Sequence, residues 1–160
     1  MIERLFPGAE HLQNIHPLLV HFPIAFLPGA ALLYFLAATL KSDSFKWAAF
    51  WMLMLGALGA AISAASGLYA EDGVMVAPSV RDALLEHHEH VMIVVCIAAG
   101  VLALWALLAR PMPERARWVF VAGLIAMCAV LARGADYGGR LVYDYNAGGD
   151  ACSQPIDFSK

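Results

Sequence analysis

The first thing that this sequence lacks is charge. Only 14% of its 160 residues are charged, against about 25% in a soluble globular domain, and 61% are hydrophobic. Such a chain cannot cover a water-facing surface with polar side chains. The composition therefore excludes an ordinary soluble protein and predicts one whose main solvent is lipid.

Motifs of several common functional classes are also absent. The three cysteines show no CxxC spacing, and no CxxCH motif for covalent haem attachment occurs. The formal net charge is −3 and no basic run is present, so nucleic-acid binding is not expected. Nothing resembles a catalytic nucleophile or a phosphate loop, which argues against a hydrolytic enzyme. Residues 1–21 carry Glu3 and Glu10 against a single Arg4, so we expect no cleaved signal peptide.

Long apolar stretches are what the sequence has instead. Four stretches are free of charge, at residues 22–40, 47–70, 91–109 and 118–132. A transmembrane helix needs roughly 20 mostly apolar residues. The sequence therefore predicts an all-α fold, an integral membrane four-helix bundle over residues 1–137, with an extramembrane C-terminal tail at 138–160. No internal repeat is visible.

The fourth stretch is the shortest, and two arginines flank it. We expect Arg117 and Arg133 to extend their charged groups toward the two interfaces and so lengthen this span. A re-entrant fourth segment is the alternative.

The loops predict an orientation. With four spans, the loops at 41–46 and 110–117 share one side, and the termini share the other with residues 71–90. The two short loops hold five basic and two acidic residues, whereas the other side holds five basic and eleven acidic ones. Basic residues concentrated in short loops favour the cytoplasmic side. We therefore expect a multi-pass protein of the bacterial inner membrane with both termini outside the cytoplasm.

Proline and small residues mark the first two helices. Pro17, Pro23 and Pro28 should bend the first helix, because proline removes a backbone hydrogen bond. The second helix carries small residues at steps of three and four from Gly56 to Gly67. Such a stripe is typical of close helix packing in membranes, and a substrate groove is the alternative.

The six histidines carry the functional hypothesis. They stand at positions 11, 16, 21, 87, 88 and 90, all on the predicted outer side. His21 and His90 each precede a 19-residue apolar stretch, so they should lie at matching heights on two helices. Imidazoles at one level on facing helices suit axial coordination of a haem iron. Interfacial histidines without a ligand are the alternative for each residue taken singly.

Charged neighbours of the histidines leave several interpretations open. Glu86 and Glu89 stand beside the HHEH run at 87–90. They could bind a non-haem transition metal together with the histidines, or accept a hydrogen bond that orients a ligating histidine. They could also be acidic residues that simply stabilise the N-terminal end of a helix. Arg133 and Arg140 could donate to haem propionates or to lipid phosphates.

One segment closely resembles a known family. The string His-Pro-Leu-Leu-Val-His-Phe-Pro at 16–23 is similar to the HPxxVHFP motif of small four-helix bacterial membrane proteins, known as domain of unknown function 2231. The likeness extends over most of the chain, with His88 matching a histidine that opens the third helix and residues 138–143 matching a Gly-Gly-x-Leu-Val-Tyr segment. Relatives fused to cytochrome-like modules imply a role near haem or electron transfer. Many relatives have a histidine where this chain has Asp136, so the resemblance does not support a second haem here.

We therefore expect a membrane protein that binds haem b and carries single electrons, rather than a stand-alone enzyme. The expected cofactor-binding or metal residues are His21 with His88, then His16 and His90, and Arg133 and Arg140 beside them. Expected partners are the lipid bilayer and a respiratory-chain or cytochrome protein, with an oligomer open. The alternatives are a structural or assembly subunit without a cofactor, and a non-haem metal protein.

Overall fold

The computed structural model describes residues 14–74, 76–145 and 147. Within those residues the chain forms helices and connecting turns, with no strand. Four helical segments are long and apolar enough to cross a membrane, at His16–Leu40, Asp43–Gly73, Pro78–Ala109 and Glu114–Tyr143. The prediction of an all-α, integral membrane four-helix bundle is confirmed.

The first span is interrupted near its start. It consists of α2 (His16–Leu19) and α3 (His21–Leu40), separated by a turn at Val20. The break has a local cause, because Pro23 has no N–H to donate to the carbonyl four residues earlier. The expected effect of proline on this helix is therefore visible at its N-terminal end.

The second span, α4 (Asp43–Ala70), packs closely on the first through its glycines. A Cβ atom added at Gly56 would lie 2.7 Å from Leu27 Cδ2, and one added at Gly59 would lie 3.0 Å from Phe22 Cβ. The small residues thus let two helix backbones approach. The interpretation as a packing seam is confirmed at these two positions.

The third span changes its helical type before the histidines. It comprises α5 (Pro78–Val80), the π-helical segment η3 (Arg81–Leu85) and α6 (Glu86–Ala109). The short turn η2 (Glu71–Gly73) precedes it, and Arg81 Nη1 donates to Glu71 Oε1 at 3.0 Å. This contact fixes the start of the third span against the end of the second.

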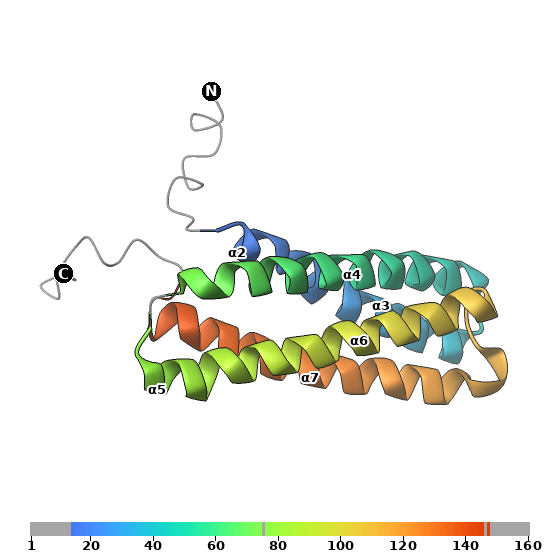
Figure 1. Ribbon diagram of the computed structural model, residues 1–160. Helices are drawn as coiled ribbons and strands as arrows, with labels where there is room; N and C mark the ends of the chain where they lie inside the picture. Colours follow the sequence, from blue (N-terminus) through green and yellow to red (C-terminus); the bar gives the residue numbers. More distant parts are fainter. Residues whose placement is uncertain (1–13, 75, 146, 148–160) are drawn as a thin grey trace, which may run out of the picture.

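The fourth span is longer than its charge-free stretch. After the turn η4 (Glu114–Ala116), α7 runs without interruption from Arg117 to Tyr143. It is not a re-entrant segment, because it extends along the whole bundle (Figure 1). Residues 138–143, expected in the tail, belong to this helix, and residues 148–160 lie outside the described part.

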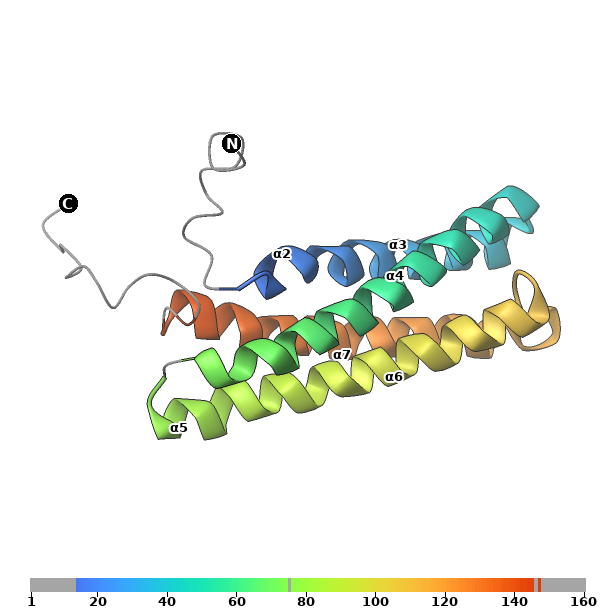
Figure 2. The same cartoon turned by 45° about the horizontal axis from the view of Figure 1, so that its top comes forward.

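The four helices form a bundle of two helical hairpins (Figures 1 and 2). The first hairpin is α2, α3 and α4, and the second is α5, η3, α6 and α7. Across the hairpins, α3 packs against α7 and α4 packs against α6. A continuous apolar core joins all four helices, with the fully buried Leu27, Tyr34, Leu53, Phe120 and Leu124 among its members.

The two ends of the bundle differ in their residues. We call the end with α2, α5 and the C-terminal ends of α4 and α7 the histidine end, and the opposite end, with the two hairpin turns, the loop end (Figure 1). Between them, large apolar side chains such as Trp51, Ile97 and Leu108 are more than half exposed, as expected for a lipid-facing surface.

Candidate functional site

His16 and His88 meet inside the histidine end. His16 begins α2, His88 lies in the first turn of α6, and both are partly buried. Their ring centroids are 6.4 Å apart, and the ring planes are at 81° to each other. The two residues come from different hairpins, so the fold brings together side chains that are 72 positions apart in the sequence.

His16 is oriented by α4. Its Nδ1 lies 3.0 Å from the carbonyl oxygen of Ser63 and 3.0 Å from Ser66 Oγ. The Ser66 hydroxyl donates its hydrogen to the same Ser63 carbonyl at 2.9 Å, so both neighbours act as acceptors toward the ring. His16 Nδ1 therefore carries the hydrogen, and in the neutral ring Nε2 keeps its lone pair.

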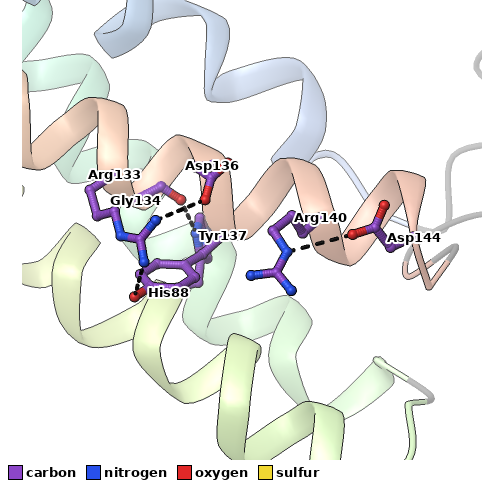
Figure 3. Close-up of polar contacts among 7 residues, drawn as sticks. All are labelled: His88, Arg133, Gly134, Asp136, Tyr137, Arg140 and Asp144. Carbon is purple, nitrogen blue, oxygen red and sulfur yellow. Dashed lines mark hydrogen bonds and ion pairs between the residues drawn. The ribbon is translucent and has the colours of Figure 1, made fainter.

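His88 is oriented in the same way by α7. Its Nδ1 lies 2.8 Å from the carbonyl oxygen of Gly134 (Figure 3). A carbonyl can only accept, so Nδ1 donates and Nε2 keeps its lone pair. A backbone carbonyl on the far ring nitrogen is the usual companion of a histidine that binds a metal through the other nitrogen.

The spacing of the two rings suits a shared ion. A metal–nitrogen bond of about 2.0 Å on each side places the centroids of two opposed imidazoles roughly 6 Å apart. The measured separation of 6.4 Å is close to that value. The angle between the planes is no obstacle, because two imidazoles can bind one ion with their planes perpendicular to each other.

The other histidines lie outside this pair. His21 is exposed, and its Nδ1 is 3.3 Å from the carbonyl of Leu18 in the preceding short helix α2. His90 is exposed as well, and the exposed His87 contacts the Asp82 carbonyl and lies 6.0 Å from the Tyr137 ring. His11 lies outside the described residues. The structure thus brings His88 to His16, and it does not bring His88 to His21, which the sequence favoured.

The reason for this difference is rotation about the helix. Five residues separate His16 from His21, and five steps of about 100° turn the side chain by roughly 140° from its starting direction. Matching heights along the bundle were therefore not enough to identify the pair. His16 faces α4, and His21 faces outward.

Arg133 and Arg140, the two arginines near the end of α7, already have partners on the same helix. Arg133 donates to Asp136 at 3.2 Å and to the Tyr137 hydroxyl at 3.1 Å, and its guanidinium also lies 4.5 Å from the Tyr137 ring centroid. Arg140 Nε lies 3.5 Å from Asp144 Oδ2. Figure 3 shows these contacts along α7 on the flank of His88. Both arginines are about half exposed, so charged groups of a ligand or lipid can reach them.

The carboxylates near the histidines do not complete a metal site. Glu86 is exposed, and Glu89 is partly buried next to His88 in the sequence. Among residues 14–74, 76–145 and 147, no three side chains of His, Cys, Asp or Glu lie close enough to hold one metal ion. The site in the described structure is therefore a pair of imidazoles.

Sequence reasoning missed the groups that orient the pair. The acceptors are the main-chain carbonyls of Ser63 and Gly134. Every residue has such a carbonyl, so the residue type does not identify them. A signal was nevertheless present, because both carbonyls belong to helix segments rich in small residues. Small residues allow a bulky ring from a neighbouring helix to reach the backbone.

Comparison with known proteins gives a family but no function. No curated protein and no solved structure matches the chain. A family model matches residues 12–151, which include both histidines of the pair and the helices that orient them. The chain belongs to the family described as "Predicted membrane protein (DUF2231)".

Proposed function

We propose that this protein holds one b-type haem between His16 and His88 and carries single electrons in the bacterial inner membrane, as a subunit or partner of a respiratory complex. The observation that carries the proposal is the pair of imidazoles, 6.4 Å apart between their centroids and supplied by separate hairpins. Both Nδ1 atoms are engaged by carbonyls, so both Nε2 atoms are available as ligands.

The donor set fits haem better than it fits a metal held by side chains alone. A structural or catalytic zinc takes at least three protein ligands, and the described residues offer no such group. A porphyrin iron needs only two axial ligands from the protein, and two histidines are a common choice. The chemistry that haem supplies when bound is reversible one-electron transfer at its iron.

The residues of the chain have three roles in this proposal. The carbonyls of Ser63 and Gly134 hold the rings and raise the basicity of the ligating nitrogens. The apolar side chains of the bundle exclude water from the interior. Arg133 and Arg140 can exchange their present acidic partners for ligand carboxylates, which they bind with charge-assisted hydrogen bonds.

A visible spectrum of the protein purified from membranes tests the proposal. We expect a Soret band that shifts on reduction, together with about one iron per chain by metal analysis. Replacing His16 or His88 with Ala should abolish the band, because each substitution removes one axial ligand. His88→Met should keep the haem but raise its reduction potential, because methionine–histidine ligation favours the reduced iron.

His21→Ala and His90→Ala are the matched controls, because they remove exposed histidines from the same two spans. Both variants should keep the full spectrum. A wild-type protein without iron or colour, produced in cells that make haem, would exclude the proposal. A full-strength band in both His16→Ala and His88→Ala would exclude the ligand pair.

One observation favours a different function, that of a structural or assembly subunit. The two rings are already close neighbours, near perpendicular, and their Nδ1 hydrogen bonds are satisfied without a ligand. In that case the purified wild-type protein is colourless, and the histidine substitutions lower only its stability.

A further inference from the structure

The two hairpins place their histidines in matching surroundings. His16 Nδ1 contacts the carbonyl of a residue 47 positions later, and His88 Nδ1 contacts one 46 positions later. In each case the histidine lies near the start of a helix, α2 or α6, and the carbonyl lies in the second half of the last helix of the same hairpin, α4 or α7. The two hairpins therefore repeat this contact between a histidine and a main-chain carbonyl.

A glycine follows each of these carbonyls by four residues. A Cβ atom added at Gly67 would lie 2.9 Å from His16 Cε1, 3.3 Å from Nδ1 and 3.5 Å from Nε2. One added at Gly138 would lie 2.8, 3.2 and 3.6 Å from the same three atoms of His88. The two sets agree within 0.1 Å, so the two rings lie on their glycines in the same pose.

The close contact explains why glycine is needed at both positions. A Cβ at either place would be closer to a ring carbon than real Cβ atoms come, and the ring cannot move away without leaving its carbonyl. An alanine would therefore tilt the imidazole, weaken its Nδ1 hydrogen bond and turn its Nε2 in a new direction.

We propose that Gly67 and Gly138 are positioning residues, and that Ser63–Gly67 and Gly134–Gly138 are two copies of one histidine seat. By a seat we mean a carbonyl that binds Nδ1, followed four residues later by a glycine beneath the ring. Each copy of the seat binds Nδ1 and leaves the same atom, Nε2, as the ring nitrogen without a hydrogen. This part of the inference rests on the proposed function. Two identical nitrogen donors suit a ligand with two equivalent faces, such as a planar macrocycle with an iron at its centre.

Nitrogen NMR of the imidazole rings in the cofactor-free, full-length protein tests the seats without any haem. At alkaline pH, where the rings are neutral, we expect His16 and His88 to carry their hydrogen on Nδ1, with signals assigned by single-histidine substitutions. Gly67→Ala should change the signal of His16 and leave that of His88. Gly138→Ala should do the reverse.

Each variant contains its own control for folding, because the untouched seat reports whether the bundle is intact. Gly139→Ala is a further control, since a Cβ there would have its nearest neighbour, Tyr143 Cδ2, at 4.0 Å. It should change neither signal. Hydrogen on Nε2 of both rings in the wild type, or an unchanged His16 signal in Gly67→Ala, would overturn the proposal.

Binding of added haem to the same proteins separates the two proposals. If the seats and the haem are both real, Gly67→Ala and Gly138→Ala each weaken haem binding by about 10- to 100-fold, as expected for groups that orient a ligand. If the NMR results are as expected but the wild type binds no haem, the seats stand and the proposed function falls.

Discussion

Tyr34 shows how one polar group is accommodated in the apolar core. Its side chain is fully buried, and its hydroxyl donates to the carbonyl of Pro111 at 2.8 Å. The ring packs edge-on against Phe120, with the centroids 4.9 Å apart. The hydrogen bond links α3 of the first hairpin to the turn of the second at the loop end.

Tyr34→Phe should therefore weaken the bundle while keeping its packing. We expect a loss of about 1 kcal/mol in the free energy of unfolding, because the ring remains but the carbonyl of Pro111 loses its donor. Denaturant unfolding in detergent micelles measures the difference. Tyr69→Phe is the control, since Tyr69 is 89% exposed and its variant should match the wild type. Equal midpoints for Tyr34→Phe and the wild type would contradict this role.

At the same scale, the sequence predicted the histidines of interest but not their pairing. His16 and His88 were both among the expected ligands, since histidine at membrane depth is unusual in itself. The preferred partner of His88 was His21, because height along a span can be counted from the sequence. The direction of a side chain also depends on its rotation about the helix and on what lies opposite, here the Ser63 carbonyl. That information comes only with the packing of α2 on α4.

The helix α4 packs on α3 through small residues. Gly56 is buried, and a Cβ there would lie 2.7 Å from Leu27 Cδ2 and 3.2 Å from the Leu27 backbone nitrogen. The side chain of Leu27 can rotate, but its backbone can yield only if α3 moves. The seam between these helices therefore tolerates no added methyl group at this position.

Gly56→Ala should destabilise the protein by about 1–3 kcal/mol, the usual cost of overpacking a well-packed core. Gly100→Ala is the matched control, because Gly100 lies within α6 and a Cβ there would meet nothing within 4 Å. The control should be as stable as the wild type or more stable, since alanine favours a helix. Thermal unfolding of both variants in the same detergent measures the difference in stability. An equal loss of stability in Gly56→Ala and Gly100→Ala would contradict the close packing of α3 on α4 at Gly56.

The helices themselves were largely predictable, whereas their ends were not. Charge-free stretches located all four spans, because only long apolar helices satisfy their backbone groups in lipid. The end of α7 was placed too early, because Arg133, Asp136 and Arg140 interrupt the apolar pattern. These charges pair with one another and with Asp144 along the helix surface, so the helix continues to Tyr143. The π-helical segment before His88 has no signature in the composition.

For the whole molecule, the two ends predict an orientation. The loop end carries five basic residues on or next to its two turns: Lys41, Lys46, Arg110, Arg115 and Arg117. By the positive-inside rule we expect this end in the cytoplasm and the histidine end outside it.

Labelling of single cysteines with a membrane-impermeant maleimide on intact spheroplasts tests this orientation. In a background without the three native cysteines, Ser79→Cys at the start of the third span should react. Ser44→Cys at the start of the second span should react only after the membrane is opened. Both positions are exposed, so access to the reagent differs only by side. The reverse labelling pattern would invert the assignment.

The origin of His16 and His88 in different hairpins has a further consequence. Lys46 forms an ion pair with Glu114 across the hairpins at the loop end, and at the histidine end the hairpins are linked by the Arg81–Glu71 ion pair and by the contact of the His16 and His88 rings. A ligand bound by both rings would link the two hairpins, and its binding would raise the free energy of unfolding of the bundle. Cofactor supply would then set the lifetime of the protein: chains made without it would be the first to open and to meet a protease.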